Sequence, residues 1–129
     1  MVVEPRIFII QENPDANTVL NGILWLKGCE PHKFTEGNEA LNEIKKFDGK
    51  VDAVVISGKI AADRNLMLVV NIKKINYNIN VLVIGDDESD KIRLMGYGTD
   101  EFTLRPMSPE NVADKVLMLI SREKVKENR

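Results

Sequence analysis

The sequence predicts an α/β fold in which helices cover both faces of one parallel sheet of five strands. Short β-branched runs alternate with longer segments of helical pattern along the chain. Two of these runs, residues 7–10 and 81–84, are apolar at every position, as expected of strands that are buried on both faces. This alternation of short strands with helices is typical of a doubly wound sheet.

Residues that typically begin or end a helix indicate where the first elements lie. The first helix should begin at Asn13 and Pro14, because asparagine caps a helix and proline suits its first position, and it should end at Gly28. Thr35 is the expected cap of a second helix that ends near Gly49. The expected strands cover residues 6–10, 31–34, 51–56, 81–84 and 101–104.

Three more helices complete the expected set of five. The third should cover residues 62–76, with Asn78 marking its exit, and the fourth about residues 88–95. Ser108 and Pro109 repeat the cap-proline signal before the last helix. Because crossovers are right-handed, five parallel strands favour the flavodoxin-like strand order 2-1-3-4-5.

Composition indicates one cytoplasmic domain that spans residues 1–129, with a core of about 5–122 and a charged helix end or tail at 123–129. The chain is 43% hydrophobic and 29% charged, which is ordinary for a soluble globular protein. A net charge of -2 gives no broad attraction for nucleic acid. The longest apolar run, 66–70, is too short to cross a membrane, and the single cysteine, Cys29, excludes an internal disulfide.

Ligands of such sheets bind at the carboxyl ends of the strands, around the point where the strand order reverses. At that edge the sequence places Gln11 and Glu12 after the first strand, Ser57 after the third and Gly85 after the fourth. Arg105 follows the fifth strand. We therefore expect these side chains to lie together at one edge of the sheet.

This layout resembles the bacterial response-regulator receiver family, of the chemotaxis-regulator type, over nearly the whole chain. In that family an acidic pair after the first strand holds magnesium, and an aspartate after the third accepts a phosphoryl group. The matching positions are Gln11 with Glu12, and Ser57. Magnesium prefers carboxylates and water, so the resemblance implies weak or absent magnesium binding and no other cofactor or metal.

The remaining signature positions depart from the family as well. The threonine or serine after the fourth strand is matched by Gly85, and the lysine after the fifth by Arg105, which we expect to pair with Glu12 in place of the ion. Phe102 matches the family's switch aromatic. The resemblance therefore implies a degenerate phosphorylation site, a pseudo-receiver without enzymatic activity.

Ser57 itself allows three interpretations. It is a small polar residue that caps a strand, or part of a pocket that binds a partner, or a site that a serine kinase phosphorylates.

Two apolar features suggest an interaction surface. On the first helix Trp25 points away from the face we expect to pack on the sheet, which comprises Ala16, Val19, Leu20, Ile23 and Leu24. The apolar run 66–70 is hydrophobic all round, which indicates either deep burial or a dimer or partner patch, for which Met67 and Leu68 are the candidates.

The main hypothesis is a two-component-type signalling module that acts without phosphorylation by binding a partner protein or a second copy of itself. One alternative is an atypical receiver that is still phosphorylated or switched by a ligand at the strand ends. Another is a flavodoxin-like domain that binds a small ligand. For flavin, the acidic, proline-bearing segment 11–15 counts against this last alternative.

Overall fold

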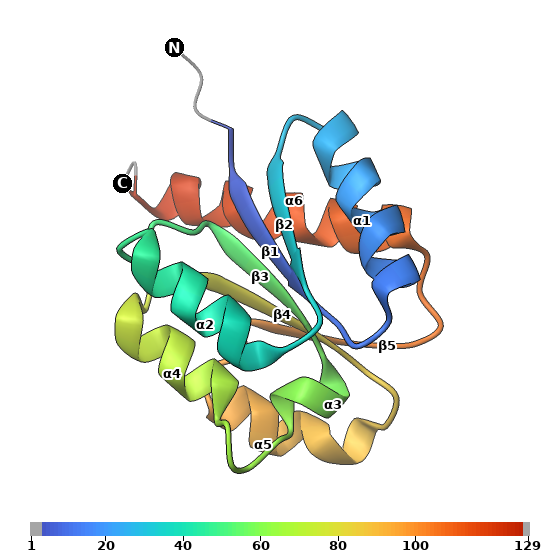
Figure 1. Ribbon diagram of the computed structural model, residues 1–129, viewed down its shortest axis with the longest axis vertical. Helices are drawn as coiled ribbons and strands as arrows, with labels where there is room; N and C mark the ends of the chain where they lie inside the picture. Colours follow the sequence, from blue (N-terminus) through green and yellow to red (C-terminus); the bar gives the residue numbers. More distant parts are fainter. Residues whose placement is uncertain (1–3, 128–129) are drawn as a thin grey trace.

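The computed structural model describes residues 4–127 of the chain, with side chains in the last helix described as far as Arg122. It contains a five-stranded, fully parallel sheet in the order β2-β1-β3-β4-β5, which confirms the predicted fold. Helices α1 and α6 lie on one face of this sheet, and α2, α4 and α5 lie on the other (Figure 1). Within the described residues, no helix has both the length and the apolar character needed to cross a membrane.

The strands form where the apolar runs predict them, with small differences at the ends. Side chains of the first strand point alternately to the two faces of the sheet. Phe8 and Ile10 belong to one core cluster, and Ile7 and Ile9 belong to the other. The strands are β1 (Arg6–Ile10), β2 (Glu30–Phe34), β3 (Ala53–Ser57), β4 (Asn80–Gly85) and β5 (Glu101–Leu104).

Residues 4–127 contain six α-helices, and not the expected five, because a short helix forms at Gly58–Ala61, before the expected third helix, which is itself shorter than residues 62–76. A short extra helix, α3, begins directly after β3, and α4 begins only at Leu68. Between them, the Asp63 carboxylate accepts the N–H groups of Asn65 and Leu66, and Met67 has a φ of 48°, which ends any continuous helix. The helices are α1 (Pro14–Leu26), α2 (Gly37–Lys46), α3 (Gly58–Ala61), α4 (Leu68–Ile75), α5 (Lys91–Gly96), which follows the 3₁₀ turn η1 (Glu88–Asp90), and α6 (Pro109–Glu127).

Two of the three predicted helix caps are confirmed. The Asn13 side chain accepts the N–H groups at the start of α1, and the Ser108 hydroxyl accepts the N–H of Asn111 at 3.1 Å. The cap at Thr35 is wrong: α2 is preceded by Glu36, whose side chain makes no capping bond. The helix begins at Gly37, where a Cβ atom would lie 2.3 Å from the side chain of Leu66, so a larger residue here requires Leu66 to shift.

The predicted end segment 123–129 overlaps the last turns of α6, and its side chains lie outside the described part of the chain. The core clusters draw on residues from 7 to 120.

Helix α1 is rotated relative to its predicted face: Leu20, Ile23 and Leu24 pack as expected, whereas Ala16 and Val19 do not. Its buried residues are Asn17, Leu20 and Leu24, whereas Val19 is 52% exposed and Ala16 is exposed as well. The Asn17 amide donates 3.0 Å hydrogen bonds to the backbone carbonyls of Gln11 and Phe34. The Asn17 side chain therefore links the carboxyl ends of β1 and β2. These two hydrogen bonds require Asn17 to face the sheet, and this requirement fixes the rotation of α1.

We predict that Asn17→Ala lowers the free energy of unfolding by about 1–3 kcal/mol more than Asn21→Ala, because a buried carbonyl loses its donor. Asn21 lies on the same helix, and no side-chain hydrogen bond is found for it within residues 4–122. Both substitutions change helix propensity equally, so the difference in urea unfolding isolates the hydrogen bonds. Equal losses in the two variants would contradict this role for Asn17.

Candidate functional site

The structure brings three of the signature positions together where β1, β3 and β4 end. Gln11 follows β1, Ser57 ends β3 and Gly85 ends β4, and the register pairs Ser57 with Ile84 of the neighbouring strand. Gln11 and Ser57 are buried, at 7% and 0% exposure. These three residues therefore lie together at the predicted edge of the sheet, and the side chains of Gln11 and Ser57 are buried there.

Ser57 has two local partners. Its hydroxyl donates to the Glu12 carboxylate, which extends from the loop after β1. The same oxygen accepts the N–H of Ile60 at 3.4 Å, so Ser57 is the N-cap of α3. The structural role of Ser57 is therefore to cap the helix after β3, and not to cap the strand as expected.

Arg105 does not pair with Glu12, and that expectation is wrong. The guanidinium lies 3.3 Å from both carboxylate oxygens of Asp86 and 3.4 Å from the side-chain oxygen of Gln11. The cause is the backbone: the Arg105 N–H donates to the carbonyl of Gly85 at 2.9 Å, which starts the side chain beside the residue after β4. The Glu12 carboxylate is already engaged by the Ser57 hydroxyl.

Gly85 is closely covered by an aromatic ring. A Cβ atom on Gly85 would lie 2.6 Å from Cζ of Phe102, and a Cβ atom on Gly58 would lie 2.8 Å from the Cα of Gly85. Phe102 is half-buried and packs against the core cluster on the α2–α4 side. Its ring therefore occupies the space into which a side chain at position 85 would project.

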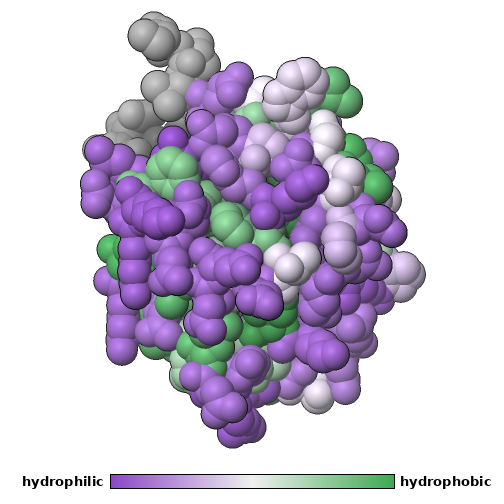
Figure 2. All heavy atoms as spheres, viewed as in Figure 1, coloured by the Kyte–Doolittle hydropathy of each residue, from purple (hydrophilic) through white to green (hydrophobic). Residues whose placement is uncertain are grey.

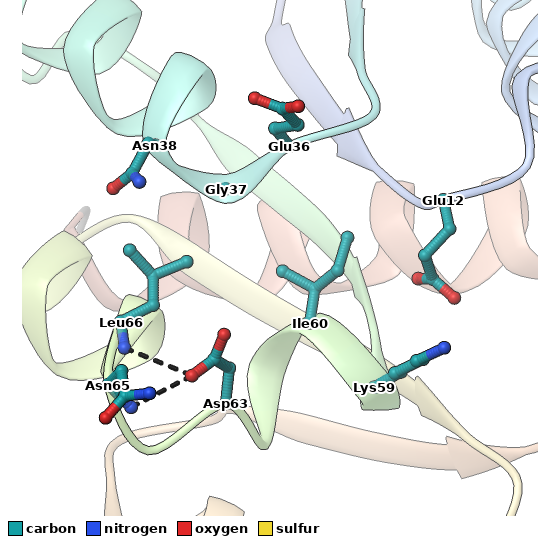
Figure 3. A pocket seen from close by; sticks show the side chains of 9 residues that line it. All are labelled: Glu12, Glu36, Gly37, Asn38, Lys59, Ile60, Asp63, Asn65 and Leu66. Carbon is teal, nitrogen blue, oxygen red and sulfur yellow. Dashed lines mark hydrogen bonds between the residues drawn. The ribbon is translucent and has the colours of Figure 1, made fainter.

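Beside Ser57 the surface is hollowed between the loop after β1, the start of α2 and the α3–α4 segment (Figure 3). The hollow encloses about 490 Å³. Figure 3 shows Glu12 and Lys59 extending on one side of it, with Glu36 and Asp63 on other elements. Three carboxylates against one ammonium make this hollow acidic.

The acidic run after β4 has separate structural roles. Asp86 faces Arg105, whereas Asp87 caps η1 by accepting the N–H of Ser89 at 2.9 Å. That backbone hydrogen bond holds the pKa of Asp87 below its ordinary value.

Within residues 4–127, no group of three or more His, Cys, Asp or Glu side chains has an arrangement that could hold a metal ion.

The candidate interaction residues have different environments. Trp25 is 66% exposed, as its helical position predicts, whereas Leu68 is completely buried, so its assignment to a surface patch is wrong. Leu68 is the first residue of α4 and points into the core, and Met67, just before the helix, is half-buried. Hydrophilic residues cover most of the face in Figure 2, and hydrophobic residues show there only in small groups.

The fold is that of response regulator receiver domains. The chain superimposes on the CheY-like receiver domain protein of Methanospirillum hungatei JF-1 with a TM-score of 0.84 at 14% identity, over 96% of this chain and 99% of that one. A receiver domain protein from Clostridium thermocellum gives a TM-score of 0.81 at 20% identity, over 94% and 98% of the two chains. No family model matches the sequence.

Among curated proteins the chain is similar to the aerobic respiration control protein ArcA of Escherichia coli strain K12. The two are 23% identical over 119 residues, which cover 92% of this chain and 49% of ArcA. The chain thus spans about half the length of the curated relatives that it matches.

Sequence reasoning missed two contacts at this edge. The position of Asp86 directly after the fourth strand was available as a signal for its pairing with Arg105. Nothing in the sequence signalled that the Phe102 ring covers Gly85, because that contact joins two strands through the detailed placement of one ring.

We predict that Gly85→Ala destabilises the protein by about 1–3 kcal/mol, because the added methyl group overlaps the Phe102 ring. In a Phe102→Ala background the same change should cost almost nothing, so the two effects should couple in a double-mutant cycle measured by chemical unfolding.

Gly22→Ala is the matched control, because a Cβ atom there meets nothing within 4 Å. This control should be neutral or stabilising, since alanine is favoured over glycine inside a helix. Equal effects of Gly85→Ala in the two backgrounds would contradict the proposed overlap.

Proposed function

We propose that this chain is a receiver-like module of two-component signalling that acts through protein contacts and without phosphorylation. The observation that carries the proposal is the state of Ser57, a buried hydroxyl bonded to Glu12 at the position of the phosphoryl acceptor. The receiver fold supports the signalling class, and the chemistry of the strand ends supports independence from phosphate.

Phosphoryl transfer onto a receiver needs a nucleophilic carboxylate, a cation and groups that stabilise charge on the phosphoryl oxygens. Ser57 supplies a neutral hydroxyl whose oxygen is fully buried as the cap of α3. Gly85 has no side chain to donate to a phosphoryl oxygen, and the Phe102 ring fills the space beside it. The burial of Ser57 also disfavours its phosphorylation by a kinase.

The residues present do not suit a magnesium ion. Glu12 is bonded to Ser57, and Gln11 offers a neutral amide whose oxygen accepts from Arg105. The Arg105 guanidinium lies close to Gln11 and would repel a magnesium ion bound there. Magnesium also prefers carboxylates and water as ligands. We therefore infer weak or absent magnesium binding, no other cofactor and no enzymatic activity.

The proposed output is binding to a partner protein or to a second copy of the chain. Trp25 and Leu26 end α1 with 66% and 79% exposure, and exposed tryptophans are frequent centres of binding energy. Charge offers no broad attraction for nucleic acid, so we propose a cytoplasmic module that binds neither nucleic acid nor membrane.

Incubation with magnesium and acetyl phosphate should leave the intact mass unchanged, because the acceptor carboxylate is missing. A receiver domain that retains the aspartate, treated in parallel, verifies the phosphodonor. Gain of one phosphoryl group by this chain, lost in Ser57→Ala, would overturn the proposal.

Trp25→Ala should leave the folded state intact by circular dichroism and weaken the complex that the tagged chain retains in a pull-down. Met118→Ala is the control, because Met118 is 60% exposed on a different helix, α6. Sedimentation of the purified chain measures self-association in the same variants. Identical behaviour of Trp25→Ala and the unchanged chain in both assays removes Trp25 from the interaction surface.

A further inference from the structure

A second hollow lies on the opposite side of the sheet, between the first half of α1 and the loop that joins β5 to α6. It encloses about 440 Å³, within the range of roughly 300–1,000 Å³ that small-molecule sites occupy. The elements that border it meet on the α1–α6 face in Figure 1. This groove is separate from the acidic hollow beside Ser57.

The lining of the groove is mainly apolar. Leu20, Ile84 and Val112 are almost fully buried and belong to the core cluster on this face, and Met107 packs against the same cluster. Val19 borders the groove and is 52% exposed. The buried residues thus form the floor of the groove, and the more accessible Ala16, Val19 and Met107 form its walls.

The polar lining is provided by Arg105 and Gln11. The contact of Arg105 with Asp86 is 3.3 Å long, where about 2.7–2.9 Å is usual between charged groups, and its contact with the neutral Gln11 amide is 3.4 Å long. Asp86 is 71% exposed and free to turn into solvent. Within residues 4–122, only the oxygen of the Gln11 amide is engaged, so its NH₂ group remains available as a donor.

An apolar groove that contains a guanidinium and an amide donor complements one chemical class. We propose that it binds a small amphipathic carboxylate, whose carboxylate group pairs with Arg105 and the Gln11 amide. The apolar part of the ligand lies against Ala16, Val19 and Met107, above the buried floor of the groove. Planar bidentate pairing with a carboxylate is the contact for which a guanidinium is suited.

The neighbouring charges set the selectivity of this site. The carboxylate of the ligand replaces Asp86 as the partner of Arg105, whereas a cationic ligand of the same length meets the guanidinium and must compete with it for Asp86. The inference does not depend on the loss of phosphorylation, because no residue of the Ser57 and Glu12 pair lines this groove.

The test is a titration with decanoate, followed by amide chemical shifts of the ¹⁵N-labelled chain. Saturable shifts are expected at Leu20, Ile84, Met107 and Val112. Decyltrimethylammonium, which has the same tail and the opposite charge, should bind at least about tenfold more weakly, the ratio that 1.4 kcal/mol produces.

Two pairs of variants separate the charge from the groove. Arg105→Gln should weaken decanoate binding about tenfold, whereas Arg105→Lys, which keeps the charge, should weaken it less. Val19→Glu places a carboxylate at the groove and should abolish binding, whereas Leu26→Glu, a matched change on the same helix outside the groove, should not.

Shifts that are absent, or that centre away from the groove, overturn the proposal. Equal affinities for decanoate and decyltrimethylammonium, or for the unchanged chain and Arg105→Gln, overturn it as well, because they show that the tail binds without recognition of the carboxylate.

Discussion

The close approach of β3 and β4 at their carboxyl ends is the constraint on which the rest of this edge depends. A Cβ atom on Gly58 would lie 2.8 Å from the Cα of Gly85, so the backbones meet too closely to leave room for a side chain at position 58. The space beside Gly85 is then filled by Phe102. Because protein interiors are close-packed, the ring and the glycine require each other, and a hydroxyl-bearing side chain cannot be added without moving Phe102.

Two charged side chains at this edge have partners on neighbouring segments. Glu12 accepts a hydrogen bond from the Ser57 hydroxyl, and Arg105 faces Asp86. An exposed ion pair such as Arg105 with Asp86 contributes only about 0–1 kcal/mol, much less than the burial of the apolar residues beneath it. Packing therefore holds the edge together, and the charges remain available for contact with ligands.

The features that the sequence predicted correctly are those set by local or periodic patterns. The bounds of β1 and β5, the caps at Asn13 and Ser108 and the exposure of Trp25 each follow from a short stretch of chain. The helix over residues 62–76 failed because the Asp63 turn and the positive φ of Met67 are decided by backbone geometry, which apolar composition does not reveal.

The errors at the site have a common cause. Counting apolar residues put Ala16 on the sheet-facing side of α1, but the buried residue is Asn17, whose amide bonds two strand ends. The pairing of Arg105 with Glu12 was inferred from charge alone, and the choice of partner depends on where the backbone of each residue lies. Such tertiary contacts form only once the sheet is assembled, so the periodic pattern of the sequence does not predict them.

The two hollows are connected through consecutive residues. Glu12 lines the acidic hollow with the α3–α4 segment, and Gln11 lines the apolar groove against α1 and α6. The end of β1 thus divides the edge of the sheet into two surfaces of different chemistry. A ligand on the groove side would draw Arg105 away from Asp86 while the bond between Ser57 and Glu12 stays intact. Under the proposal of a carboxylate ligand, a signal would therefore be received across the sheet from Ser57.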